Sequence, residues 1–271
     1  MVIVQAMEAL GNEFILIDAI SQKIDSEEEL KLLKICAKEF SFDQLLFLEP
    51  PTQKHAHLKL KIYNVDGSLA ENCVNGIRAL ALYAFDESLV FSNTFILQIE
   101  DNLAQITRLQ ENEFAVKMSS FKFTKSSCAI ADSQELQFNF EGTDIKFYPV
   151  SVGNPHAVIF QDILSDQIPE MGLTLQESNI YKNGVNVGFV EILNEKEINL
   201  RVVERGVGET LACGSGACAA VLSGVKNNLL QSSVLVNFKK GKLKVEVNLD
   251  EEWFNLIGEA KYIEKGIKIN P

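Results

Sequence analysis

The feature that most constrains the fold is a repeat between the two halves of the 271-residue chain. Three short stretches recur in the same order: LGNEF (10–14) as VGNPH (152–156), QLLFLE (44–49) as NVGFVE (186–191), and LKIYN (60–64) as LRVVE (200–204). The first two pairs are 142 positions apart and the third pair is 140 positions apart. In both copies a cysteine, Cys73 or Cys213, follows the third stretch nine positions later. We therefore interpret the chain as a duplicated unit of about 120–140 residues, an ordinary domain size.

Within each copy the pattern predicts strands that lead into a helix. HLKLKIYN (57–64) alternates apolar and polar residues before the turn-forming Asp66-Gly67, and an Ala/Leu-rich stretch follows Cys73. The second copy runs in the same way through INLRVVE into CGSGACAAVLSG. Further strands are predicted at 95–106, 114–123 and 234–248, the last as a hairpin that turns at Lys240-Gly241.

These elements indicate an α/β (α+β) protein in which strands dominate and each half has one central helix. We expect an N-terminal half at 1–115 and a C-terminal half at 116–260. The final segment, 261–271, is predicted to return as a strand that completes the first half.

Composition excludes several classes of partner. The net charge is −12 and no basic run compensates for it, so nucleic acid is not expected as a partner. No apolar run approaches the length that spans a membrane. The N-terminus does not read as a signal peptide, and five cysteines are too few and too irregular for a disulfide framework. We expect a cytoplasmic protein with reduced thiols, whose partner is a small molecule.

Cys73 and Cys213 each lie at the predicted start of a helix, where backbone N–H groups are unpaired and carry partial positive charge. Such a helix end binds a carboxylate through main-chain donors and lowers the pKa of a thiol. Asn75 and Ser215, each two residues after a cysteine, also lie in the first turn. In a two-fold arrangement the two thiols would flank one ligand. They could then remove a proton from one face of a carbon and return one to the other.

The other cysteines have a simpler interpretation as buried small residues. These are Cys36, Cys128 and Cys218. The spacing of Cys213 and Cys218 does not fit a zinc finger or ribbon, so no metal site is expected there.

The three histidines differ in context. His55 and His57 lie two apart on a predicted strand and are interpreted as an exposed pair, with metal binding as the lesser alternative. His156 follows Gly-Asn-Pro at a landmark of the repeat. From the residues alone, it is either a turn histidine or a functional one.

Four motifs resemble those of the diaminopimelate epimerase family, and the resemblance covers nearly the whole chain. They are ERGVGETLACGSGACAA (204–220), DQLLFLEP (43–50), SVGNPHAVIF (151–160) and NGVNVGFVEI (183–192). The resemblance implies an enzyme that uses neither pyridoxal phosphate nor any other cofactor and that interconverts LL- and meso-2,6-diaminopimelate, in lysine and peptidoglycan precursor biosynthesis. It also implies two pseudo-symmetric domains, each a curved, mostly antiparallel sheet around a central helix, with the active site in the cleft between them.

The resemblance also implies roles for individual residues. Cys73 and Cys213 would be the acid–base pair, supported by His156 and Glu204. The remaining implied residues bind substrate. Backbone amides of Val74, Asn75, Gly214 and Ser215 would hold the reacting α-carboxylate. Asn64, Asn154, Asn186 and Arg205 would bind the distal amino acid group, with Asn12 and Gln44 lining the same cleft. Glu204 would also bind substrate. A homodimer is also expected.

One motif departs from the family pattern. The first cysteine motif usually reads Cys-Gly-Asn-Gly, whereas here it reads CVNG, with Val74 at the glycine. We expect Val74 to have a negative φ, as in the first turn of a helix, because a β-branched residue is strained at positive φ. Two alternatives stay open: a racemase of the same fold for another amino acid, and an inactive amino-acid-binding protein.

Overall fold

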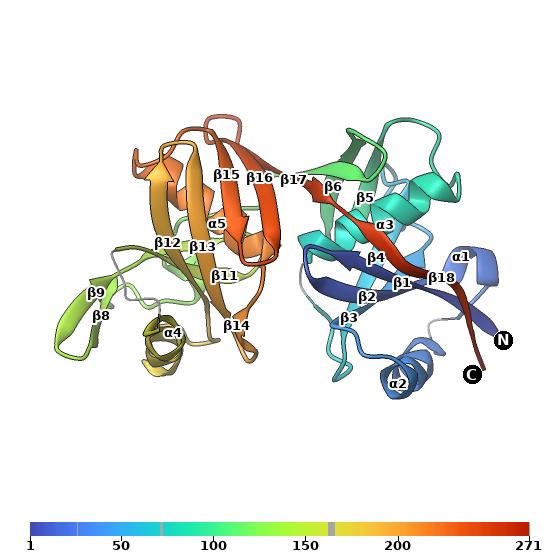
Figure 1. The fold of residues 1–271 in the computed structure, drawn as a ribbon, viewed down its shortest axis with the longest axis horizontal. Helices are drawn as coiled ribbons and strands as arrows, with labels where there is room; N and C mark the ends of the chain where they lie inside the picture. Colours follow the sequence, from blue (N-terminus) through green and yellow to red (C-terminus); the bar gives the residue numbers. More distant parts are fainter. Residues whose placement is uncertain (26, 71–72, 162–165, 271) are drawn as a thin grey trace. The chain divides into compact units, whose positions relative to one another are not determined.

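The computed structural model describes residues 1–25, 27–70, 73–161 and 166–270, so Pro271, the last residue of the expected C-terminal strand, lies outside the described residues. The chain forms two compact units (Figure 1). The first contains Met1–Met118 together with Ile257–Pro271, and the second contains Ser119–Leu256. The C-terminal strand β18 (Lys261–Ile269) pairs antiparallel with β1 (Val2–Ala9), so the end of the chain belongs to the same sheet as its beginning.

The first unit is a mixed sheet with strand order β18-β1-β2-β3-β4-β5-β6-β7. Its further strands are β2 (Asn12–Asp18), β3 (Gln44–Glu49), β4 (Leu58–Asn64), β5 (Thr94–Ile99), β6 (Asn102–Arg108) and β7 (Glu113–Met118). Its helices are α1 (Ala19–Gln22), α2 (Glu29–Glu39) and α3 (Val74–Asp86). Helix α3 contacts β1, β2, β3 and β7, strands from distant parts of the sheet, so the sheet curves around this helix.

Both faces of this sheet are covered, which explains the continuous apolar runs in β2 and β3. One face carries Phe14 and Leu46, whose side chains lie beside Gly76 of α3. The other face packs Ile15 and Phe47 against α2. Alternation of the strand residues thus builds one core around α3 and a second core under α2.

The second unit repeats this plan with strand order β10-β11-β12-β13-β15-β16-β17, and β14 pairs with β13. Its strands are β8 (Gln137–Phe140), β9 (Thr143–Lys146), β10 (Tyr148–Ser151), β11 (Pro155–Phe160), β12 (Asn186–Asn194), β13 (Glu197–Glu204), β14 (Gly208–Thr210), β15 (Ser233–Phe238), β16 (Gly241–Asn248) and β17 (Trp253–Glu259), of which β17 extends into the residues grouped with the first unit. Its helices are η1 (Ser126–Cys128, a 3-10 turn), α4 (Ile168–Glu177) and α5 (Gly214–Lys226). Helix α5 contacts β10, β11, β12, β13 and β16, and α4 covers the other face.

The strand register repeats between the units. Phe14 pairs with Gln44 across the parallel strands β2 and β3, and His156 pairs with Asn186 across the parallel strands β11 and β12. Each residue of the second pair lies 142 positions after its counterpart in the first pair, which is the offset that relates the two copies. In each unit an antiparallel pair (β3–β4 or β12–β13) and then a parallel pair (β4–β5 or β13–β15) follow. The repeat found in the sequence is therefore also present in the pairing.

Most predicted elements are present, with three differences. The predicted strand at 95–106 is a hairpin, β5–β6, whose turn contains Glu100 at φ 49°. The predicted strand at 114–123 ends at Met118. Each unit also has a helix on the outer face of its sheet, α2 or α4, in addition to the one predicted central helix. The hairpin at 234–248 is confirmed as β15–β16.

In the part of the chain that the structure describes, no helix has both the length and the apolar character needed to span a membrane.

Candidate active site

Cys73 caps the N-terminus of α3. Its backbone is extended (φ −143°, ψ 92°), and its Sγ accepts a hydrogen bond from the backbone N–H of Gly76 at 3.4 Å. Val74 is the first residue of the helix, is buried, and is not among the residues with positive φ, as predicted. A Cβ on Gly76 would lie 3.0 Å from Leu46 Cδ2 and 3.6 Å from the thiol, so glycine lets the helix end approach the sheet closely.

Cys213 has the same place on α5. Its backbone is again extended (φ −141°, ψ 110°), and its Sγ accepts from the N–H of Gly216 at 3.4 Å. The Oγ of Ser215 lies 3.5 Å from this sulfur. A Cβ on Gly216 would be 3.3 Å from Sγ, closer than at Gly76. Each thiol is thus the N-cap of the central helix of its unit, as the sequence predicts.

The expected lowering of the thiol pKa is wrong for Cys213. Burial, followed by the nearby Glu204 carboxylate, raises the pKa of this thiol well above its usual value. Hydrogen bonds from Ser215 and the Gly216 N–H act in the opposite direction but are outweighed. Without a ligand, Cys213 is therefore a protonated thiol at neutral pH.

In the first unit, the predicted residues form two hydrogen-bonded pairs near the start of β2 and the facing ends of β3 and β4. The Nδ2 of Asn75 donates to Asn12 Oδ1 at 2.6 Å. The Nε2 of Gln44 donates to Asn64 Oδ1 at 3.0 Å, because the two residues are direct partners across β3 and β4. We call these four residues with Cys73 and Val74 the first half-site.

In the second unit, His156 is buried, with Nε2 3.1 Å from Asn154 Oδ1. Burial, aided by the positive charge of Arg205, lowers the pKa of His156 to about 3, so its imidazole is neutral. Its backbone carbonyl accepts a hydrogen bond from the Tyr181 hydroxyl at 3.4 Å. His156 therefore enters any chemistry as a neutral group with a fixed ring, rather than as a cation.

The turn after β13 brings the remaining predicted residues together. The backbone N–H of Arg205 donates to Asn186 Oδ1 at 3.0 Å, and its guanidinium donates to the Asn183 carbonyl at 2.9 Å. Gly184 has φ +73°, and a Cβ there would lie 2.7 Å from Arg205 Cδ. Only glycine therefore allows the arginine to lie across this loop. The hydroxyl of Thr210 donates to the Glu204 carboxylate.

We call the predicted residues of this unit the second half-site. They are Asn154, His156, Asn186, Glu204, Arg205, Cys213, Gly214 and Ser215. Among them, Ser215 and Glu204 lie beside Cys213, Asn154 contacts His156, and Asn186 contacts Arg205.

Sequence reasoning missed several residues that contact the predicted ones, among them Arg78, Asp43 and Thr210. Arg78 is fully buried on α3 and donates to Asn75, and Asp43 accepts from Asn12. Thr210 contacts Glu204. A usable signal existed for Arg78, because a charged residue in an otherwise apolar helix, three positions after Asn75, faces the same side as Asn75.

The remaining cysteines and histidines agree with their simpler interpretations. Cys36, Cys128 and Cys218 are buried, and burial raises the pKa of Cys36 to about 12. His55 and His57 are exposed, but neither lies on a strand as predicted, because β4 begins at Leu58. Among the described residues, no group of three or more His, Cys, Asp or Glu side chains is placed to hold a metal ion.

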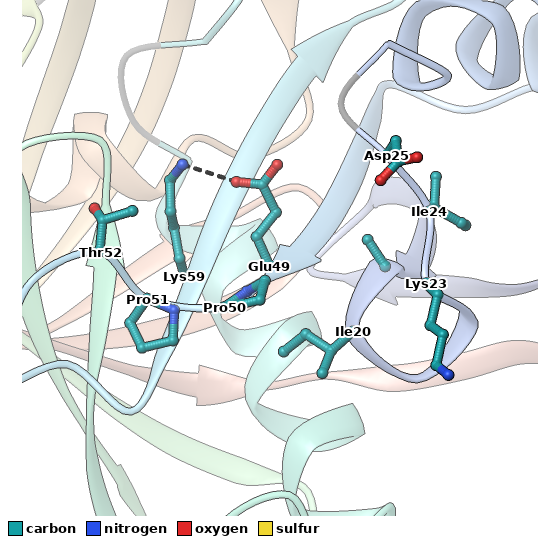
Figure 2. A pocket seen from close by; sticks show the side chains of 10 residues that line it. Ile20, Lys23, Ile24, Asp25, Glu49, Pro50, Pro51, Thr52 and Lys59 are labelled. Carbon is teal, nitrogen blue, oxygen red and sulfur yellow. Dashed lines mark ion pairs between the residues drawn. The ribbon is translucent and has the colours of Figure 1, made fainter.

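A hollow of about 440 Å³ in the first unit lies between α1 and the loop after β3 (Figure 2). Figure 2 shows the Glu49–Lys59 ion pair, 2.7 Å long, facing Pro51 and Thr52. None of the predicted site residues lines this hollow. The half-site chemistry is therefore separate from it.

Known proteins resemble this chain in sequence and in fold. The family model for diaminopimelate epimerase matches residues 4–124 and 148–263. The diaminopimelate epimerase of Teredinibacter turnerae is 35% identical over 266 residues, which cover 96% of each chain. The diaminopimelate epimerase of Acinetobacter baumannii is 36% identical over 247 residues, which cover 89% of this chain and 88% of the relative.

A solved structure of a hydroxyproline epimerase from Agrobacterium vitis shares the fold. It has a TM-score of 0.72 at 11% identity and covers 99% of this chain and 90% of its own. At that identity the likeness concerns the fold alone. The sequence matches cover almost the whole chain, including both capping cysteines, and on that basis the chain belongs to the diaminopimelate epimerase family.

Proposed function

We propose that this protein interconverts LL- and meso-2,6-diaminopimelate, with Cys73 and Cys213 as the two acid–base groups and without pyridoxal phosphate, another cofactor or a metal. The observation that carries the proposal is the matched pair of capping thiols. Both sulfurs accept a helix N-terminal N–H at 3.4 Å, at equivalent positions of a duplicated unit. An enzyme that inverts a carbon needs one proton acceptor and one proton donor, one on each face.

The helix ends supply the site for the α-carboxylate. The backbone N–H groups of Val74 and Asn75 begin α3, and those of Gly214 and Ser215 begin α5. Four such donors, with the partial positive charge of two helix ends, would bind the carboxylate and stabilise negative charge that develops on it as the α-proton leaves. Valine at position 74 does not remove its main-chain donor, and its helical backbone is unstrained.

Proton transfer follows from the state of the thiols. We assign Cys213, whose thiol pKa is raised, as the proton donor and Cys73 as the base, so that Cys73 takes the α-proton from one face while Cys213 donates its proton to the other. Afterwards Cys73 is the thiol and Cys213 the thiolate, which is the state that catalyses the reverse reaction. Glu204, whose carboxylate lies near the Cys213 thiol, would exchange a proton with it, and neutral His156 would support the geometry. Proton exchange with solvent restores the starting state.

The substrate has a second amino acid group, which needs its own polar partners. We assign this group to Asn64, Asn154, Asn186, Glu204 and Arg205, with Asn12 and Gln44 lining the same site. Arg205 is exposed and held by a single backbone carbonyl through its guanidinium, so it is available to a carboxylate.

The proposal also includes a cellular location and an oligomeric state. A cytoplasmic location is proposed because the five cysteines are too few and too irregularly spaced for a disulfide framework. Assembly as a homodimer is also proposed, and sedimentation velocity at several protein concentrations would test it.

The test is to incubate the purified, reduced protein with LL-diaminopimelate in D₂O, without added pyridoxal phosphate. Chiral chromatography and mass spectrometry should show meso-diaminopimelate with deuterium at one α-carbon. Proline and 4-hydroxyproline serve as alternative substrates. Turnover of either one but not of diaminopimelate would indicate a racemase of the same fold. Binding of diaminopimelate without exchange would indicate an inactive binding protein. Either result would contradict the proposal.

A further inference from the structure

A line of four hydrogen-bonded side chains connects a buried arginine to the surface of the first unit. Arg78 Nη2 donates to Asn75 Oδ1 at 2.9 Å. Asn75 Nδ2 donates to Asn12 Oδ1 at 2.6 Å. Asn12 Nδ2 donates to Asp43 Oδ2 at 3.3 Å. We call Arg78, Asn75, Asn12 and Asp43 the amide relay.

The chemistry of its two ends gives the relay a direction. A guanidinium only donates hydrogen bonds, and an ionised carboxylate only accepts them. An asparagine amide does either, depending on which way it is turned. Because Arg78 donates, Asn75 turns its oxygen toward Arg78 and its nitrogen toward Asn12. Asn12 then accepts from Asn75, and its own nitrogen points to Asp43, which accepts it.

Both ends are themselves held in place. Arg78 is fully buried, and its Nε also donates to the Glu259 carbonyl at 3.3 Å. The Asp43 carboxylate accepts from the backbone N–H of Glu13 at 2.8 Å. The backbone N–H of Asp43 in turn donates to the Glu13 carbonyl at 2.8 Å. Neither end is therefore free to reverse its role.

The second unit provides an internal comparison. By the offsets of the repeat, Arg78 corresponds to Cys218 and Asp43 to Val185. Both of these residues are fully buried, and helix α5 still begins at a cysteine cap with the same geometry. A helix of this kind therefore forms against its sheet without a relay. The fold does not require Arg78 and Asp43, which points to a role in the site.

We propose that Arg78 and Asp43 are positioning residues that hold the amides of Asn75 and Asn12 in one orientation, in which one N–H of each amide donates within the relay and the second N–H is left for an anionic group of the ligand. If either amide turned over, a carbonyl oxygen would replace an N–H donor beside the helix end, and it would repel a carboxylate. The relay thus keeps the first half-site selective for a carboxylate. This inference rests on the proposed function for its kinetic readout.

The relay makes a distinctive prediction for a double-mutant cycle. With one end removed, the other end still fixes the direction of both amides, but one amide loses a hydrogen bond that holds its position. Arg78→Gln and Asp43→Ala should each raise KM for diaminopimelate by roughly threefold to tenfold, with kcat changed less. With both ends removed, the amides turn freely, so the double variant should raise KM well beyond the product of the two single effects.

A matched control separates polarity from packing. A lysine at position 78 is also a donor-only group, although it alters packing and loses the forked shape. In the cycle of Arg78→Lys with Asp43→Ala, the relay keeps its direction, so the KM effects should multiply. The proposal would be overturned if the KM increases of Arg78→Gln and Asp43→Ala simply multiplied in the double variant. It would also be overturned if the double variants of both cycles exceeded the product of their single effects by the same factor. Thermal unfolding of every variant identifies losses that arise from folding.

A second measurement needs neither a variant of Arg78 nor catalysis. In wild-type protein labelled with ¹⁵N-asparagine, the side-chain NH₂ signals of Asn75 and Asn12 should exchange slowly with solvent. The variants Asn75→Ser and Asn12→Ser assign these signals. Rapid exchange of both amides would overturn the relay, even if Arg78→Gln did not fold. If the wild type fails to turn over diaminopimelate but shows the protected amides, the proposed function fails and the relay stands.

Discussion

The buried imidazole of His156 should make the second unit sensitive to mild acid. The side chain is 1% exposed, and its Nε2 faces Asn154 Oδ1 at 3.1 Å. Burial first, and the charge of Arg205 second, lower its pKa to about 3. In the unfolded chain an ordinary histidine has a pKa of about 6.5.

The direction in which the free energy of unfolding changes with pH depends on whether the folded or the unfolded chain binds the proton more readily. As the pH falls below the unfolded value, the unfolded chain takes up a proton that the folded chain refuses. The folded state is therefore progressively destabilised as the pH falls from about 6.5 toward about 3. From about pH 7.5 to about pH 5, this one group lowers the free energy of unfolding by about 2 kcal/mol. At the lower pH the buried imidazole is still neutral.

Urea unfolding at the two pH values measures this effect. The chain has one tryptophan, Trp253, and it lies in the same unit as His156, so its fluorescence reports the unfolding of that unit. His156→Gln removes the titrating group and keeps a polar side chain. The wild type should lose about 2 kcal/mol more than His156→Gln on acidification. His55→Gln, an exposed control, should lose as much as the wild type. Equal losses for the wild type and His156→Gln would refute the reasoning.

Three further predictions concern the capping motifs. Gly216→Ala would place a Cβ 3.3 Å from Cys213 Sγ, so it should lower kcat/KM by roughly tenfold. Gly76→Ala should lower kcat/KM by less, because its Cβ would lie 3.6 Å from Cys73 Sγ. Initial rates of both variants, compared at unchanged melting temperature, check this order. Val74→Gly should keep diaminopimelate as substrate with only a modest change in kcat, while the loss of a buried side chain lowers stability by roughly 2–3 kcal/mol in urea unfolding. A wild-type protein that is inactive until Val74→Gly switches it on would contradict this. Mild oxidation without ligand should form a Cys73–Cys213 disulfide, which peptide mapping would detect, and should remove activity until a reductant is added. Intact activity with no crosslink would contradict this prediction.

The sequence was most informative where the two copies could be compared. The repeat placed Cys73 and Cys213 at equivalent points, and small residues around them predicted a helix start, which both caps confirm. The hairpin at 234–248 was recognisable from Gly241. The β5–β6 turn was not, because it uses Glu100 in a left-handed conformation that glutamate rarely adopts.

The electrostatics of the site depended on three-dimensional contacts. From position alone, a thiol at a helix end should be acidic, and the pKa of Cys213 is instead raised because burial and Glu204 outweigh the helix end. The amide relay joins Asp43 to Arg78, which lie 35 positions apart in the sequence. Nothing in the local pattern of either residue indicates the other.

The proposed mechanism requires Cys73 and Cys213 to act as two acid–base groups, and α-proton exchange by single-cysteine variants tests this requirement most directly. Cys73→Ala and Cys213→Ala are compared with Cys218→Ala, a control that changes a buried cysteine of the same helix as Cys213 without touching its cap. Deuterium incorporation from D₂O and conversion between the LL and meso forms are followed together. We expect each of the first two variants to lose epimerisation by roughly a thousandfold or more while remaining folded, and Cys218→Ala to keep it. Near-wild-type conversion by either Cys73→Ala or Cys213→Ala would contradict the two-thiol mechanism.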